Sequence, residues 1–443
     1  MKDNKLGIMP ISKLIWNMSL PIIVSMLVQA LYNIVDSVFV SQVSEQALTA
    51  VTLAFPAQNL MIGLATGTAV GVNALLGRAL GAGDGKRADQ VAINGIFLAV
   101  VGFVLSAVLA LCFAGTFFRT QTDIDYIVDN GITYLRICCC ASLGMFCEIM
   151  FERLLQGTGR SILSMYTQGL GAIVNIVLDP ILIFGLGMGV KGAALATVIS
   201  QGISCVWVLS FLTGSKTVLK IKKENFLTGL RFLPPCIALG MSAFVMQGSE
   251  SVISLCFNSS LLQYGGDLAV GAMTILSSVM QFAMLPLQGI AQGAQPGNRE
   301  RVSRTFRLLL RSSLVYSFGL WALVQLFPGA FAGLFTNDAA LLAFTAKALR
   351  VYCGALCLFG AQIACQMTFV STGNAVCSII VAILRKFVLL IPLIYLMPRL
   401  MTDQTMAVYT AEPIADGIAV LCTVMIFAVQ FKKALHRLDE ART

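Results

Sequence analysis

Apolar runs of about 20 residues recur along the whole chain, and they restrict its fold more than any other feature. Each run is long enough to cross a hydrocarbon layer of roughly 30 Å at 1.5 Å per residue. The runs do not alternate apolar and polar residues, as the strands of a membrane barrel would. Charged residues make up 12% of the chain, against about 25% in a soluble domain. The sequence therefore predicts an all-α integral membrane protein.

We expect twelve transmembrane helices. The expected spans are residues 14–40, 47–75, 90–115, 132–155, 162–186, 192–213, 234–262, 267–294, 304–328, 346–371, 375–397 and 407–431. The lead from Met1 to Lys13 is short, basic and polar, and the first apolar run is too long for the core of a cleaved signal peptide.

The formal net charge of +9 raises the question of a polyanionic partner. If the N-terminus is cytoplasmic, most basic residues fall in the inner loops and chain ends. The exceptions are Arg119, Arg136, Lys191, Lys347, Arg350 and Arg399. This asymmetry is the positive-inside rule, so the charge indicates topology, with both termini cytoplasmic, and no nucleic-acid partner is expected.

The two halves of the chain resemble each other, as in many transporters. A shift of 214 residues places Pro21 on Pro235 and Asp36 on Glu250, whereas residues 45–74 fit best with a shift of 222. The change of shift predicts about eight extra residues in an outer loop around Asn258 to Gly266. It also predicts eight missing residues between Pro296 and Gly297, which would shorten the eighth span.

Six spans per half place both halves in the same orientation, as two pseudo-symmetric six-helix bundles. We expect an N-terminal lobe at 1–214 and a C-terminal lobe at 233–443. The basic segment 215–232 is expected to be a cytoplasmic linker with an amphipathic piece on the anionic inner leaflet.

Three acidic residues lie inside apolar spans, where an ionised carboxylate costs about 2.5–3.5 kcal/mol. They are Asp36, Asp179 and Glu250. Tyr32 lies one helical turn before Asp36 and Asn175 one turn before Asp179, so each pair shares a face. Such oxygen ligands suit a proton or Na⁺. The alternative is that each acid sits at a helix end or bonds a neighbouring backbone.

Other chemistries find little support. Most of the 13 cysteines fall inside apolar spans without the spacing of metal ligands, and the single histidine, His436, lies in the charged tail. We expect no zinc site, no histidine proton relay and no cofactor.

Several motifs in fixed order resemble the multidrug and toxic compound extrusion (MATE) family over nearly the whole chain. They are LYNIVDSVFV, GRALGAGDGKRAD, QGTGRS, NIVLDPILIFGLGMGVKGAALAT, LPLQGIAQGAQP and FTNDAALLAFTAKALRVY. The resemblance implies two six-helix lobes that form a V around a central cavity. It also implies export of organic cations driven by inward flow of Na⁺ or H⁺.

The family's coupling residues match this sequence one by one. The resemblance implies cation or proton coupling at Asp36, Asp179, Asn175, Tyr32 and Thr197, with Glu250 as a second-lobe candidate. Some members bind the cation through an acid in span ten, where this chain has Gln362 and Gln366. The family also continues beyond QGAQP where this chain has its gap, which leaves impaired coupling or a tighter inner turn as hypotheses.

The sequence thus predicts a monomeric antiporter of the cell inner (cytoplasmic) membrane that contacts lipids and exports small lipophilic organic cations. The residues expected to line the cavity are Met145, Gln281, Phe282 and Gln288. One rival is a flippase for a lipid-linked saccharide, but the spans hold few basic residues for a pyrophosphate besides Arg385 and Lys386. The other is an intramembrane enzyme, for which no nucleophile with a base, and no metal cluster, is apparent.

Overall fold

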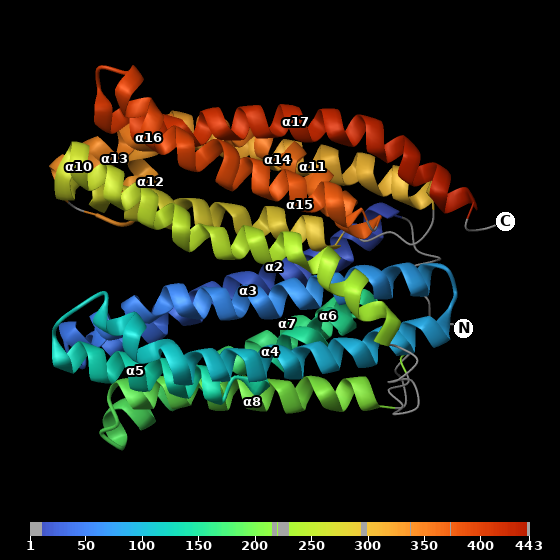
Figure 1. Ribbon diagram of the computed structural model, residues 1–443, viewed down its shortest axis with the longest axis horizontal. Helices are drawn as coiled ribbons and strands as arrows, with labels where there is room; N and C mark the ends of the chain where they lie inside the picture. The colour runs from blue at the N-terminus through green and yellow to red at the C-terminus, as the bar shows by residue number, and fades with distance from the viewer. Residues whose placement is uncertain are drawn as a thin grey trace. The chain divides into compact units, whose positions relative to one another are not determined.

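The structure is a computed structural model. It describes residues 11–214, 219, 230–293, 299–336, 338–372 and 374–440. Among these residues it leaves aside the side chains of 11–15, 45, 267, 293, 299–302 and 432–440. Figure 1 shows the described chain built from helices, so the predicted all-α membrane fold is confirmed.

The described residues of the first half form seven α-helices and one π-helical segment. They are α2 Ile11–Ser41, α3 Glu45–Gly81, α4 Gly85–Arg119, α5 Asp125–Cys140, α6 Leu143–Gly157, α7 Ser161–Pro180, η1 Ile181–Gly185 and α8 Val190–Thr213. The start of α4 follows from the glycine-rich loop after α3. Gly83 adopts a φ of 76°, and the next residue, Asp84, accepts a hydrogen bond from the Arg87 amide as the N-cap.

The second half repeats this order, except that its first two spans lie in one long element, α10. Its elements are η2 Leu230–Phe232, α10 Leu233–Gly293, α11 Arg299–Leu326, α12 Pro328–Gly333, α13 Ala339–Tyr352, α14 Leu356–Ser371, α15 Ala375–Ile383, η3 Leu384–Leu390, α16 Ile391–Leu400 and α17 Gln404–Glu440. Within the described ranges, ten helices are long and apolar enough to cross a membrane, or twelve if each bent pair is one span.

The two bent pairs lie at corresponding places in the repeat. Helices α5 and α6 meet at 47°, and α13 and α14 meet at 49°. In the first break the Ser142 hydroxyl donates to the carbonyl of Cys139 at 2.7 Å, and in the second the indole of Trp321 donates to the carbonyl of Gly354 at 3.1 Å. These bonds satisfy carbonyls that the interrupted helices leave open. The fourth and tenth spans therefore begin earlier than expected, at Asp125 and Ala339.

The prediction of an outer loop around Asn258 to Gly266 is wrong, because α10 continues through these residues. Gly266, at φ 63° and ψ −160°, marks the kink between the seventh and eighth spans. Phe257 and Leu261 are fully buried, and the Ser260 hydroxyl donates to the carbonyl of Ile394 at 3.4 Å. Burial of this face keeps the extra residues helical.

The predicted gap between Pro296 and Gly297 lies outside the described residues, as does most of the expected linker. The flanking helix can be measured. The described part of the eighth span, Leu268–Gln292, covers 25 residues, whereas its counterpart in the first half, Gln46–Gly81, covers 36.

The described residues form two compact units, one within 20–244 and the other within 11–19 and 245–440. In the first unit α3 packs against α4, α5 and α6, and α8 packs against α6 and α7; in the second, α14 packs against α11 and α17. The unit boundaries fall inside α2 and α10. The lobes predicted at 1–214 and 233–443 stay a prediction.

Close helix packing in the first unit depends on small residues. A Cβ built on Gly71 would overlap the backbone carbonyl of Cys236 in α10, and one on Gly240 would overlap the carbonyl of Gly67. Gly67 and Gly71 form a GxxxG pair, a pattern that lets the backbones of membrane helices approach each other.

Candidate functional site

Helices α2 and α7 place two carboxyl groups inside the first unit. Asp36 is 9% exposed, and Asp179 and Asn175 are fully buried. The two aspartates are close enough to act on each other electrostatically. The structure therefore brings together the two acids that the sequence singled out.

The polar atoms of this site lack partners. Within the described part of the chain, Asp36 Oδ1, both carboxylate oxygens of Asp179 and both amide atoms of Asn175 have no hydrogen-bond partner. A buried polar group without a hydrogen bond is costly, and a buried charge more so. The arrangement can accept a proton on a carboxylate, or a hard cation among the oxygens.

The backbone beside Asp179 departs from a regular helix. Pro180 has no amide to donate, so the α-helical hydrogen-bond pattern fails at the end of α7. The chain continues as the π segment η1, in which the Leu186 amide donates to the carbonyl of Ile181 at 2.9 Å. Gly187 and Gly189 then turn the chain with φ of 64° and 53°. Single π turns often occur at functional sites.

Two further predicted coupling residues differ in their placement. Tyr32 is half-buried and lies within electrostatic reach of Asp36, Asp179 and Glu148. The Thr197 hydroxyl donates to the carbonyl of Ala193 in its own helix, at 3.1 Å. Tyr32 thus joins the pair of acids, whereas the proton of Thr197 is used within α8.

Two buried acids beside this site were missed from the sequence. Glu148 and Glu152 in α6 are 6% and 7% exposed, and Glu148 acts electrostatically on Tyr32. Their signal is the series Glu148, Glu152 and Gln156 in an apolar span, with the four-residue spacing of one helical face. Without the structure, nothing shows that this face packs against α7 and α8 and comes within electrostatic reach of Tyr32 in α2.

The second unit contains a cluster of five charged side chains. Lys386 Nζ lies 2.9 Å from Glu250 Oε1, and Arg385 pairs with Asp416 at 2.6 Å and Glu412 at 3.4 Å. Arg385 Cζ also lies 4.4 Å from the centroid of the Phe359 ring. The side chain of Glu250 is 58% exposed, whereas Lys386 is 5% exposed. Glu250, the predicted second-lobe candidate, is therefore the partner of a buried cation.

Glu412 and Asp416 were also missed from the sequence. Their signal is a pair of acids four residues apart in an apolar run, on one face of α17. Arg385 and Lys386 lie in the π segment η3 of the eleventh span. The π turn is the feature that the sequence did not indicate.

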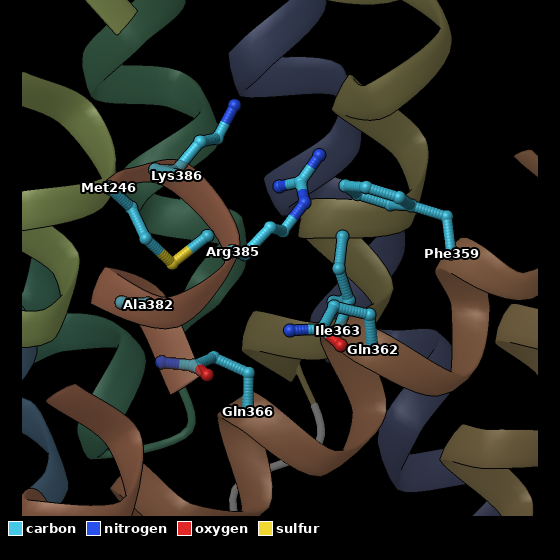
Figure 2. Close-up of a pocket in the computed structure, with 8 residues that line it drawn as sticks. All are labelled: Met246, Phe359, Gln362, Ile363, Gln366, Ala382, Arg385 and Lys386. Carbon is cyan, nitrogen blue, oxygen red and sulfur yellow. The ribbon is translucent and has the colours of Figure 1, made fainter. Parts of the chain in front are cut away.

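Figure 2 shows a small cavity beside this cluster. Its volume of about 10 Å³ is roughly enough for one water molecule. The lining residues are Met246, Phe359, Gln362, Ile363, Gln366, Ala382, Arg385 and Lys386. Gln366 Nε2 donates to the backbone oxygen and the hydroxyl of Ser378 at 2.9 and 2.8 Å. The side-chain amides of Gln362 and Gln366 in span ten therefore lie at the edge of the ionic cluster.

The four residues predicted for the substrate cavity lie in both units. Met145 in α6 is buried in the first unit. Gln281, Phe282 and Gln288 belong to α10 in the second unit, where Gln281 is exposed and the other two are half-buried. Their role stays a prediction.

Comparison with known proteins gives a consistent result. The model of one family, MatE, matches residues 21–181 and 242–396. The multidrug export protein MepA of Staphylococcus aureus strain RF122 is 24% identical over 96% of this chain and 97% of its own length. MepA of Staphylococcus haemolyticus strain JCSC1435 is 25% identical over 92% of each chain.

Solved structures agree along nearly the full length. A multidrug resistance MATE family transporter of the MOP superfamily in an outward-facing conformation superposes with a TM-score of 0.92 and 25% identity, over 98% of this chain and 99% of that one. A MOP superfamily transporter from Pyrococcus furiosus, described as having a binding pocket of reversed polarity, superposes with a TM-score of 0.91 at 25% identity and the same coverage.

Proposed function

The chain belongs to the MATE family of multidrug efflux transporters, and from this we propose that it exports lipophilic organic cations in exchange for H⁺ or Na⁺. Members of this family are membrane transporters and not enzymes. The observation that carries the antiport proposal is the pair of buried carboxylates, Asp36 and Asp179, whose oxygens mostly lack partners among the described residues.

The proposed mechanism uses the charge of these carboxylates as a switch. When ionised, they attract a cationic substrate that enters from the inner side or the inner leaflet. Protonation, or Na⁺ bound beside them, removes that attraction and favours the other arrangement of the lobes. The same ion therefore competes with the substrate, which is the thermodynamic requirement for exchange.

The energetics limit the stoichiometry. Exchange of one H⁺ for one monovalent cation moves no net charge, so the membrane potential does not drive it. The pH gradient then supplies about 1.4 kcal/mol per unit. A steeper substrate gradient requires more than one ion per cycle or coupling to Na⁺.

The ionic cluster of the second unit argues against a saccharide flippase. Such a protein needs basic side chains to hold a pyrophosphate. Here Arg385 and Lys386 are already paired with the three acids Glu250, Glu412 and Asp416. This neutralisation favours the cation exporter over the flippase.

We further propose that both termini are cytoplasmic and that the protein resides in the cell inner membrane. The support is the positive-inside distribution of the basic residues. Labelling of single cysteines introduced at exposed Asp84 and Asp123, from each side of the membrane, tests this topology.

The test of the function is ethidium efflux from proteoliposomes under an imposed pH gradient and, separately, an imposed Na⁺ gradient. We expect one gradient to drive efflux by the native chain, and Asp36→Asn to abolish it. Asp129→Asn makes the same chemical change at an exposed position of α5 and is the matched control. Equal gradient-driven efflux in native protein and Asp36→Asn would contradict the proposal.

A further inference from the structure

One face of α6 carries buried polar side chains that the exchange mechanism above does not use. Glu148, Glu152 and Gln156 follow each other at four-residue spacing and are 6%, 7% and 6% exposed. The eight steps from the first residue to the third cover about 12 Å along the helix axis. This series, the α6 polar face, lies in the part of the first unit where α6 packs against α7 and α8.

Neighbouring hydroxyls and amides line the α6 polar face. The Ser204 hydroxyl of α8 donates to the carbonyl of Thr167 at 3.4 Å and lies close to Glu148. Glu152 Oε2 accepts a hydrogen bond from Gln168 Nε2 of α7 at 3.0 Å. Gln156 Nε2 donates to the Ser164 hydroxyl at 3.0 Å. A polar group of α7 or α8 therefore lies beside each of the three side chains, on successive turns of α6.

One end of the series reaches the coupling site. Glu148 acts electrostatically on Tyr32, and so do Asp36 and Asp179. The phenol of Tyr32, which can both donate and accept a hydrogen bond, lies within electrostatic reach of both groups of acids.

The other end of the series reaches the end of the span. Gln156 Oε1 accepts from Arg153 at 3.1 Å, and Arg153 is half-exposed. One residue beyond Gln156, α6 ends at Gly157. The α6 polar face thus connects the buried carboxylates with the surface at this end of α6.

Within the described ranges, two acids and one cation interact along the series. Glu148 and Glu152 act on each other, and the cation that acts on Glu152 is Arg153. Among the described residues, Tyr32 in α2 and Cys205 in α8 are also in electrostatic contact with Glu148. Glu152 Oε1 has no hydrogen-bond partner within the described ranges. Two ionised carboxylates one turn apart repel each other, and a proton shared between them removes that repulsion.

We propose that the α6 polar face carries protons between the Asp36 and Asp179 site and the end of the span at Gly157, with Glu148 and Glu152 as the proton carriers. The inference rests on the proposed antiport and deepens it, because it makes H⁺ the coupling ion. Each step is balanced. A protonated aspartate passes its proton through the Tyr32 hydroxyl to the Glu148 carboxylate and becomes an anion itself. Glu148 then passes a proton to Glu152, which releases it to water.

A purely structural role of Glu148 and Glu152 would have different experimental consequences. If Glu148 and Glu152 only hold α6 against α7 and α8, their loss lowers the stability of the protein and affects every transport mode alike. If they carry protons, their loss slows the steps that move protons. It leaves ethidium binding and the exchange of ethidium for ethidium, which moves no net proton, intact.

The experiment uses the full chain in proteoliposomes loaded with a pH-sensitive dye, with native protein, Glu148→Gln, Glu152→Gln and the control Asp129→Asn. We expect both glutamine variants to slow ethidium-coupled proton movement by about 100-fold, the low end for loss of a proton-transfer group. Ethidium exchange and ethidium affinity should match the native protein. Glu152→Asp keeps an ionisable group and should recover a large part of the rate.

Any of the following results would overturn the inference. Native proton-coupled rates in Glu152→Gln and Glu148→Gln exclude the route, and so does a loss of exchange that parallels the loss of coupling. Native efflux driven by Na⁺ alone would overturn the route while the antiport proposal stands. A native chain that responds to neither gradient would overturn both, so the two failures are distinguishable.

Discussion

At the scale of single residues, the sequence predicted some of the buried acids as site residues and missed others. Asp36 and Asp179 were predicted because an acid in an apolar run carries a known cost and because Tyr32 and Asn175 share their faces. Glu148, Glu152, Glu412 and Asp416 have the same spacing signal. Their significance depends on which helices meet, and hydropathy along one chain does not contain that information.

Loss of Arg385 should strongly destabilise the protein. Arg385→Gln removes the partner of Glu412 and Asp416, which are buried at 4% and 5% exposure. Breaking a buried pair in this way costs about 3–5 kcal/mol, because an uncompensated charge stays behind. The thermal unfolding midpoint of the detergent-solubilised protein measures the loss.

The chain offers a matched control for this change. Lys347 pairs with Asp403 at 3.7 Å with both side chains exposed, so Lys347→Gln should cost less than about 1 kcal/mol. The triple variant Arg385→Gln, Glu412→Gln, Asp416→Asn removes the charges of Arg385 and both its partners, leaves the Lys386–Glu250 pair, and should regain most of the stability. Equal midpoints for Arg385→Gln and Lys347→Gln would show that the cluster does not behave as a buried ion pair.

At the scale of elements, helix positions followed from hydropathy and most helix breaks did not. The apolar runs located the helices, and the internal repeat located matching segments. The bends before α6 and α14 and the π segments η1 and η3 arise from local hydrogen bonding and from Pro180, which apolar periodicity does not report. The error at Asn258 to Gly266 has a similar cause, since extra residues can lengthen a helix as readily as a loop.

The close approach of α3 and α10 predicts a sharp difference between two glycines. Gly71→Ala places a methyl group against the carbonyl of Cys236, which belongs to the backbone and cannot rotate away. Overpacking of this kind costs about 1–3 kcal/mol. Gly169 lies within α7 with nothing within 4 Å of an added Cβ, so Gly169→Ala should be neutral or stabilising by up to about 1 kcal/mol. Unfolding midpoints that do not separate the two variants would contradict the packing described here.

At the scale of the whole molecule, the sequence predicted the membrane fold and the family, and it left the ion and the substrate open. The fold followed because the length of an apolar helix is fixed by the bilayer. The identity of the coupling ion could not be predicted, because a pair of carboxylates beside an amide and a phenol suits both H⁺ and Na⁺. The α6 polar face favours H⁺, since it offers carboxylates in series instead of one cage of oxygens.

The central claim is that an ion bound at Asp36 and Asp179 competes with the cationic substrate. The most direct measurement is the dissociation constant of ethidium for the purified protein, as a function of pH and of Na⁺ concentration, in native protein and in Asp36→Asn. With proton coupling we expect the dissociation constant to rise as pH falls, by up to about tenfold per pH unit for each competing proton. Asp36→Asn should bind more weakly and with a smaller dependence on pH. An affinity that responds to neither pH nor Na⁺ in the native protein, and is unchanged in Asp36→Asn, would contradict the account.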